Sequence, residues 1–411
     1  MTRMAKRMAA GLFLLLGHTA STAQELGYFI DQAEVHNPQL EALRLKYDIA
    51  GEKKVEAGAL PDTEIGAGLF VSEPETRTGP QKARISLRQM LPWFGSITAR
   101  QEYAGSLAEV EYLDWVIARR KLRLEVAERY YELQGLRQKI EILGQQGRLL
   151  DSYREVALTS VETGRASMVE VLRIDIRKND LDARQQVLEA RYQARAFAFF
   201  KLLNTPETPI LFPMAGLPEE LPEPKPPVLG PHPELEQFER LFESVTAEEA
   251  LNRKSAGPNL GFGLDYIPVA ERTDMVVPDN GKDVWMPMVS FSVPLFNTSY
   301  RSRTRQNQIR QESLEAGMAS RRNQLESLLE GAWQGQLSER IRFAAQTENR
   351  ARTRQAIEIL LKNYQTDTAD FSDLLEMQEM ELKWQLERTE ALAGYLSQGA
   401  LVNYLTAAEA N

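Results

Sequence analysis

Two stretches of this sequence pass from a strand pattern through a proline into a long helical pattern without proline. The two strand patterns cover residues 83–91 and 289–293. Proline cannot donate a backbone hydrogen bond and restricts the residue before it, so both strands are predicted to end there. A strand that leads directly into a very long helix, twice in one chain, is expected where a barrel changes into a coiled coil. The residues that mark these transitions are Pro92, Phe94, Pro294 and Phe296.

The composition limits the classes of partner. The chain has 411 residues, a formal net charge of −9 and no cysteine. Lys and Arg are interspersed with Glu along the helical patterns, which predicts solvated helix faces and no nucleic-acid partner. Without cysteine there can be no disulfide, no thiolate metal site and no lipid on an N-terminal cysteine.

The first 23 residues have the pattern of a secretory signal peptide. A basic start precedes an apolar run, 8–16, and small residues predict cleavage after Ala23. The apolar run is shorter than the roughly 20 residues of a membrane-spanning helix, and no later segment is long and apolar enough. An exported chain without such a helix can still cross a membrane as a β-barrel, because a closed barrel satisfies its backbone hydrogen bonds.

The chain aligns with itself at an offset of about two hundred residues, which indicates an internal duplication. Asn37-Pro38 opens one copy, and His232-Pro233 opens the other. Residues 204–233 hold ten of the 20 prolines and are predicted to form an extended connector. The predicted parts are a signal peptide (1–23), a first repeat (24–204), a Pro-rich connector (205–231) and a second repeat (232–411).

Each copy contains two predicted strands with apolar residues at every second position, such as Ile65, Ala67 and Leu69. This alternation is expected of a transmembrane strand of about 9–11 residues, and equally of a half-buried strand in a soluble sheet. Trp93 and Trp285 near strand ends favour the membrane alternative, because aromatic residues gather at the membrane interface. Four strands cannot close a barrel, which needs about eight, so a membrane barrel would be shared by several chains. The other apolar positions are Val71, Ile85, Leu87, Leu260, Phe262, Leu264, Tyr266, Val289, Phe291 and Val293.

A long helix and a returning helix follow each strand pair. The long patterns run from Ser96 to about Val161 and from about Tyr300 to Tyr364. Apolar spacings of three, four and seven with charged flanks indicate a coiled coil. The returning helices are predicted at 167–203 and from 371 to about 405.

The two hairpin turns also correspond, with residues 161–172 aligned to 364–375. Ser167 and Asp370 are predicted to cap the returning helices, and Gly164 suits a left-handed helix stop. These structural roles account for all three residues.

The whole mature chain resembles the TolC-type outer-membrane factors, the exit ducts of tripartite efflux and type I secretion systems in Gram-negative bacteria. The resemblance rests on the duplicated helix-strand-strand-helix-helix order, the two proline transitions and the two hairpin turns. It implies a homotrimer in which four strands per chain form a twelve-stranded transmembrane β-barrel in the cell outer membrane, continued by a long α-helical coiled-coil periplasmic tunnel. The implied partners are outer-membrane lipid, a periplasmic adaptor protein and, through the adaptor, an inner-membrane efflux pump.

By the same resemblance, the family's acidic ring at the tunnel entrance falls on Asp373 and Glu376, which share a helix face. In a trimer they would form two acidic rings that favour cations. The alternative is that both carboxylates lie in the first turns of a helix, where they suit the helix dipole. The family often has a basic residue in the second turn. This chain lacks it, and Arg165 is the candidate to replace it. The residues that the resemblance assigns to adaptor contact are Thr163, Gly164, Arg165, Thr366, Asp367 and Thr368.

No enzyme, cofactor or metal site is predicted. After signal removal only His36 and His232 remain, and each lies beside the proline that opens a repeat. The sequence has no His/Cys cluster and no Gly-rich phosphate-binding loop. The expected function is a passive outer-membrane exit duct, with drugs, metal ions and polypeptides all open as cargo. The alternative is a soluble periplasmic coiled-coil scaffold without a membrane barrel.

Overall fold

The computed structural model describes residues 17–164, 167–205, 216–218, 221–366 and 368–406. The chain divides into two compact units. The first unit contains Met1–Ala42, Val116–His232 and Arg322–Asn411, and the second contains Leu43–Trp115 and Pro233–Arg321. Both units draw on both predicted repeats, because the long helices α4 (Ser96–Glu162) and α7 (Ser299–Gln365) each contribute residues to both.

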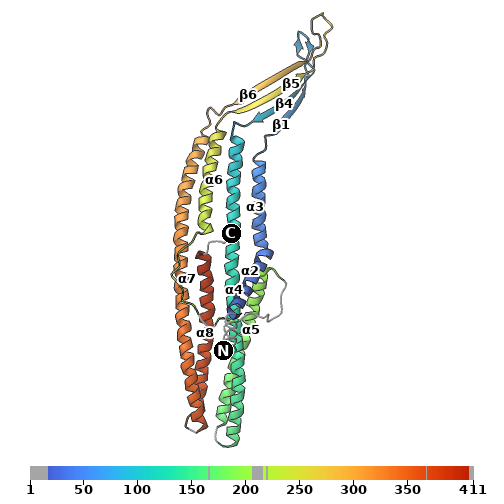
Figure 1. Cartoon of the computed structure of the whole chain (residues 1–411). Helices are drawn as coiled ribbons and strands as arrows, with labels where there is room; N and C mark the ends of the chain where they lie inside the picture. The colour runs from blue at the N-terminus through green and yellow to red at the C-terminus, as the bar shows by residue number, and fades with distance from the viewer. Residues whose placement is uncertain (1–16, 165–166, 206–215, 219–220, 367, 407–411) are drawn as a thin grey trace, which may run out of the picture. The chain divides into compact units, whose positions relative to one another are not determined.

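The second unit contains a four-stranded antiparallel sheet with the strand order β1-β4-β5-β6. The two strand pairs predicted within the repeats are confirmed, and the pairing of β4 with β5 joins the repeats. Figure 1 shows β1 and β5 following helices α3 (Pro38–Glu56) and α6 (Pro233–Ser255), while β4 and β6 lead into α4 and α7. The strands are β1 (Thr63–Leu69), β4 (Ala83–Leu91), β5 (Asn259–Ile267) and β6 (Val284–Ser292).

The strand register places the alternating apolar residues on one face of the sheet. Ile65 lies opposite Leu87, which in turn lies opposite Leu264. This face is uncovered in the single chain, because its large apolar side chains are between 38% and 84% exposed. They are Ile65, Leu69, Ile85, Leu87, Phe262, Leu264, Trp285, Val289 and Phe291.

Small and polar residues, together with the methionines Met90, Met286 and Met288, occupy most of the opposite face of the sheet. Ser86 lies opposite Gly66 on one side and Asp265 on the other. Arg84 forms an ion pair with Asp265, whose side chain is fully buried. The sheet therefore has one apolar face and one mixed face that is polar mainly along β1, β4 and β5, broadly as the alternation predicts.

The loop between β1 and β4 contains a short ladder that the predicted turn-rich loop lacks. In it β2 (Glu75–Thr76) pairs with β3 (Gly79–Pro80), and the Thr76 hydroxyl donates to the Gly79 carbonyl at 2.6 Å. Gly79 has a φ of 127°. A Cβ there would lie 1.9 Å from the carbonyl oxygen of Ala270, so only glycine permits this close approach of the loop that follows β5.

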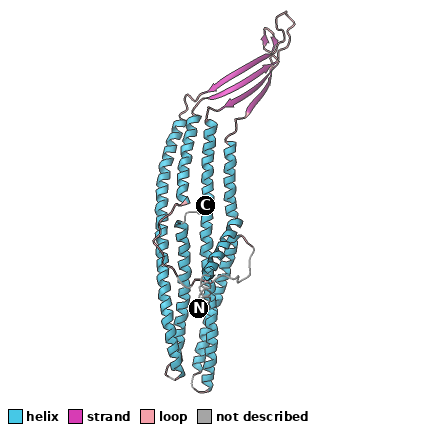
Figure 2. Cartoon of the chain, in the orientation of Figure 1, coloured by secondary structure: helices cyan, strands magenta, loops and turns pink. Residues whose placement is uncertain are grey.

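The first unit is helical and contains α2 (Gly17–His36), α5 (Met168–Leu203), α8 (Phe371–Thr406) and most of α4 and α7. In Figure 2 the helices are cyan and the strands are magenta. The Phe29 ring of α2 lies 5.2 Å from Phe199 of α5 and 5.9 Å from Tyr130 of α4, which fixes α2 against both helices. α2 precedes the first helix predicted from the sequence and begins within the predicted signal segment.

The predicted bounds of the long helices are confirmed to within one residue at each end. Sequence periodicity is informative here because apolar residues recur at helical spacing along each of these helices. Within the described residues, no helix combines the length and the apolar character needed to cross a membrane.

Candidate functional site

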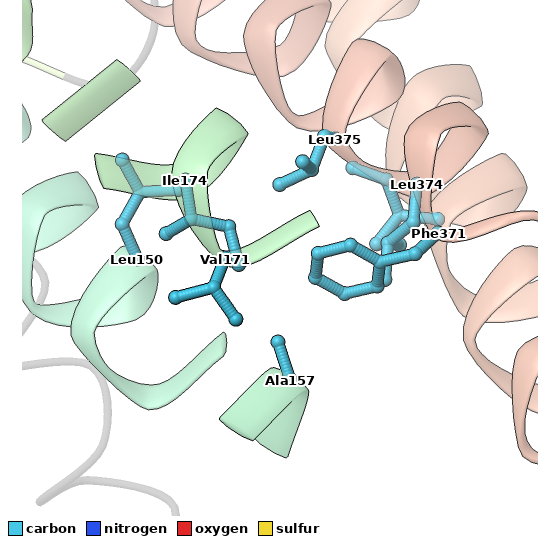
Figure 3. Close-up of a cluster of buried hydrophobic side chains, with 8 residues drawn as sticks. Leu150, Ala157, Val171, Ile174, Phe371, Leu374 and Leu375 are labelled. Carbon is cyan, nitrogen blue, oxygen red and sulfur yellow. The ribbon is translucent and has the colours of Figure 1, made fainter. Parts of the chain in front are cut away.

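The two hairpin ends come together in the first unit around a shared apolar cluster (Figure 3). The ring of Phe371 lies 5.9 Å from Tyr153 of α4 and 5.2 Å from Tyr364 of α7, so it contacts both hairpins. Burial of large apolar side chains is worth about 1.5–3 kcal/mol each, so this cluster links the hairpins at their ends, and a smaller cluster of Leu143, Leu181 and Leu382 links them further along. Its buried members are Leu150, Ala157, Val171, Ile174, Ile357, Phe371, Leu374 and Leu375.

The predicted gate residues Asp373 and Glu376 lie in the first two turns of α8. The Asp370 carboxylate accepts a hydrogen bond from a backbone N–H of the first turn at 3.2 Å, which confirms the predicted cap. Leu374 and Leu375 are each 1% exposed in the cluster, whereas the two carboxylates are exposed. Neither carboxylate forms an ion pair within the described part of the chain.

Glu376 borders open space. Together with Arg184 of α5 and Glu379 and Lys383 of α8, it lines a cavity of about 490 Å³. The exposed carboxylates are thus able to interact with ions in solution. A single chain holds one copy of each, and a ring requires further chains.

The two turns differ in how they are stabilised. In the first, Gly164 adopts a φ of 71°, as the predicted helix stop requires, and the Ser167 hydroxyl caps α5 by accepting from a backbone N–H at 3.2 Å. In the second, the Thr366 and Thr368 hydroxyls lie 3.1 Å apart, and Thr368 also donates to the backbone at 3.0 Å. Thr163, Gly164, Thr366 and Thr368 are all exposed, while Arg165 and Asp367 lie outside the described residues.

Polar contacts between the hairpins were not predictable from the sequence. Arg177 of α5 donates to the carbonyl oxygen of Leu375 at 2.6 Å and lies 3.4 Å from the Glu379 carboxylate. Gln378, only 4% exposed, donates to the Tyr153 hydroxyl at 3.0 Å. Burial raises the pKa of Tyr153, so this hydroxyl stays protonated at neutral pH. These contacts join residues about two hundred positions apart, and no local pattern marks them.

A second polar link lies further along the same helices. Lys139 of α4 lies 2.8 Å from the Glu390 carboxylate of α8. The hydrogen bond from Lys139 lowers the pKa of Glu390. The hairpins are therefore held together by an apolar cluster and by separate polar contacts along their length.

The predicted transition residues lie in the second unit, between strand and helix. Gly95, with a φ of 80°, turns the chain after Pro92 and Phe94. At the second transition the Asn297 side chain accepts from the Ser299 N–H at 2.9 Å and caps α7. The two transitions thus bend by different means. Phe94 is 78% exposed and Phe296, which follows Pro294, is 96% exposed.

Comparison with known proteins shows what this architecture is similar to. No protein-family model matches the chain, and no curated protein sequence matches it. The outer membrane protein VceC from Vibrio cholerae matches with a TM-score of 0.72 at 16% identity, over 93% of this chain and 96% of VceC. CusC matches with a TM-score of 0.76 at 13% identity, over 92% of this chain and 91% of its own.

The outer membrane channel CmeC from Campylobacter jejuni matches with a TM-score of 0.72 at 12% identity, over 93% of this chain and 85% of CmeC. The chain has the TolC-like outer-membrane factor fold. At these identities the likeness is one of fold. The TolC-like fold combines long helices with four strands per chain, so the predicted fold class is confirmed. The similar structures named here are outer-membrane proteins and channels rather than enzymes.

Proposed function

We propose that this chain is an outer-membrane exit duct that works as a homotrimer. In this proposal the sheet lies in the outer membrane and the helices continue into the periplasm as a tunnel. The duct conducts substrate passively, because an inner-membrane pump supplies the energy through a periplasmic adaptor. The proposed adaptor contacts are the hairpin turns at residues 163–165 and 366–368, of which Thr163, Gly164, Thr366 and Thr368 are exposed.

The observation that carries the proposal is the uncovered apolar face of the sheet. Nine large apolar side chains on that face are at least 38% exposed in the single chain, and the opposite face carries glycines, serines, Arg84 and Asp265 besides three methionines. Contiguous apolar surface of this kind marks contact with a membrane or a partner. Apolar-out and polar-in alternation is the pattern of membrane-spanning strands around an aqueous interior.

The open edges of the sheet support a shared barrel. β1 and β6 are the edge strands, so each has one side without a strand partner within the described chain. An exposed edge pairs readily with another strand, and four strands are too few to close a barrel, for which about eight are needed. Pairing of β6 with β1 of the next chain closes a ring and satisfies both edges.

We propose that Asp373 and Glu376 form the cation-favouring constriction at the hairpin ends. Their exposure and lack of described ion pairs support this role, since an ion pair would cancel their charge. Arg177, Gln378 and Tyr153 hold the hairpins of one chain together at the same level, and they are further candidates, beside Arg165, for restraining the constriction.

Cysteine cross-linking tests the shared barrel, because the chain has no native cysteine. Single cysteines placed along β1 (at 65, 67 or 69) and β6 (at 287, 289 or 291) should produce a cross-linked trimer in outer-membrane fractions. The matched control joins positions 87 and 264, which lie opposite each other within one chain, and should produce only a cross-linked monomer. Recovery of the chain as a soluble periplasmic monomer, with no cross-link between β1 and β6, would contradict the proposal.

A further inference from the structure

The start of α7 carries an unusual run of positive charge in the second unit. Residues 299–311 contain four arginines and no acidic residue. The last turn of α6 adds two more cations and is fixed against α7, because Asn252 donates to the carbonyl oxygen of Tyr300 at 2.9 Å and to Thr304 at 3.2 Å. The five exposed cations of this region, here called the basic collar, are Arg253, Lys254, Arg301, Arg303 and Arg305.

Nearby carboxylates neutralise little of the collar. Glu249 lies 2.9 Å from Arg253, and Glu248 lies 2.7 Å from Arg310, outside the collar. Within the described residues, neither Arg301 nor Arg303 has a carboxylate at ion-pair distance. Arginines left without carboxylates remain available to bind an external anion, and the guanidinium group binds phosphate with two parallel hydrogen bonds.

Apolar side chains project beside the collar. Between β6 and α7, Val293 is 53%, Leu295 76% and Phe296 96% exposed. They follow directly on the uncovered apolar face of the sheet. Exposed apolar side chains next to exposed cations match a membrane interface, where acyl chains meet charged headgroups. A nucleic acid or an acidic peptide would contact the arginines but would leave these apolar side chains in water.

We propose that the basic collar binds the headgroups of anionic phospholipids at the boundary between the sheet and the helices. This inference rests on the proposed function, which places the sheet in the membrane. The three α7 arginines of the collar belong to the second copy only. The first copy keeps Lys53 and Lys54 in the last turn of α3, but in the first turns of its long helix α4 Arg100 is the one basic residue and Glu102 follows it closely. Each chain would therefore bind anionic lipid more strongly beneath β6 than beneath β4.

Trp93 offers a reporter at this level. It precedes Phe94, and a Cβ on Gly257 would lie 2.9 Å from its ring, which places it next to the end of α6. Lys254 lies alongside Gly95, two residues further on. A variant that keeps Trp93 alone replaces the other four tryptophans with phenylalanine: Trp115, Trp285, Trp333 and Trp384.

The experiment reconstitutes this variant in phosphatidylcholine vesicles that contain brominated phosphatidylglycerol or brominated phosphatidylcholine, and measures quenching of Trp93. The expected result is a several-fold preference for phosphatidylglycerol that weakens as salt rises. Changing Arg301, Arg303 and Arg305 to Gln should remove most of the preference, because three of the five collar cations are lost and each cation near an anionic surface contributes up to roughly fivefold. The matched control changes Arg322, Arg352 and Arg354 to Gln, further along α7, and should keep the preference.

The other outcomes are equally informative. Equal quenching by both lipids in the variant that keeps Trp93 alone would contradict lipid binding by the collar, but would not contradict the proposed exit duct. The collar proposal would also be wrong if the Arg301, Arg303 and Arg305 substitutions left the lipid preference unchanged, or if the control substitutions reduced it equally. Absence of quenching by either lipid would mean that the sheet does not enter the bilayer, and would overturn the proposed function and the collar together.

Discussion

The long helices α4 and α7 are each 67 residues long, and the returning helices α5 and α8 are each 36 residues long. The two long helices differ in how far their apolar side chains are buried. α4 is buried at many positions, including Tyr130 and Leu133 at 0% exposure. α7 leaves Ile341 69% and Ile359 59% exposed. The two copies thus match in length and differ in surface.

This difference indicates that helix length is determined by packing within the chain, whereas the surface residues are determined by what contacts them. Both hairpins meet in one apolar cluster, so their helices must match in length. Surface residues are free to diverge once the lengths agree. Apolar side chains along α7 that stay in water forgo a stabilisation of about 1.5–3 kcal/mol each, which supports cover from another chain in the proposed trimer.

The largest expected effect contrasts Phe371 with Met168, its aligned residue in the first copy. Phe371 is 2% exposed in the cluster, whereas Met168 is 52% exposed. Phe371→Ala should destabilise the hairpin ends by about 3–5 kcal/mol, because it removes a buried ring and leaves a cavity. Met168→Ala should cost at most about 0.5 kcal/mol. Hydrogen exchange of the first turns of α5 and α8 measures both, and equal effects would show that the copies contribute equally to the cluster.

A smaller effect is expected at the polar contacts between the hairpins. Arg177→Ala removes the hydrogen bond to the Leu375 carbonyl and should weaken the contact by about 1–2 kcal/mol, since the side chain is partly exposed. Its aligned residue in the second copy, Met380, makes no such bond, so Met380→Ala is the matched control. Single-channel recording should show a raised open probability for Arg177→Ala only. A change of similar size in the control would remove Arg177 from this role.

The next prediction compares the charges of the proposed constriction with those of the aligned residues in the first copy. Asp373 and Glu376 align with Glu170 and Arg173, so the second copy is acidic where the first is mixed. Changing Asp373 to Asn and Glu376 to Gln should lower the K⁺/Cl⁻ permeability ratio by roughly fivefold, or about 1 kcal/mol, as expected for charges acting through water. Arg173→Glu should raise the ratio. Reversal potentials in planar bilayers measure both, and the gate assignment fails if neither variant shifts them.

The sequence was sufficient to predict the two strand pairs, the long helices and the returning helices, but not α2 or the short ladder of β2 and β3. Strand alternation from Ile65 to Leu69 and helical stripes from Ser96 onwards are local patterns, so their bounds match the structure closely. The caps at Ser167 and Asp370 were predictable for the same reason, because each bonds to a neighbouring backbone N–H.

Contacts between elements far apart in the chain could not be predicted from the sequence. Arg177 donates to a carbonyl of the other hairpin, and a backbone acceptor has no residue signature. The pairing of β4 with β5 depends on how the repeats meet, which periodicity within one repeat does not encode. The ladder at Gly79 depends on a close approach to Ala270 that only the folded chain creates.

The smallest expected effect is a pH dependence of the polar contacts between α6 and α7, here called the α6–α7 joint, in which Glu249 bonds to Thr304 and Asn307. Burial acts to raise the pKa of Glu249, but hydrogen bonds from Arg253, Thr304, Asn307 and Asn252 outweigh it and lower the pKa below its ordinary value. A carboxylate with a lowered pKa stabilises the fold at pH values above its ordinary pKa, and this contribution is lost as the pH falls through the folded pKa. The joint should therefore weaken below about pH 4.5, by about 1 kcal/mol or less.

In the first copy the corresponding contact is between α3 and α4. There the Lys54 side chain lies against Gly105, where the second copy uses the Glu249 carboxylate. Glu249→Gln should therefore flatten the acid side of the profile of melting temperature against pH, whereas Lys54→Met should leave its shape unchanged. If Lys54→Met flattens the profile as much, the acid response arises from general charge repulsion, and the two joints do not differ in the way that Glu249 predicts.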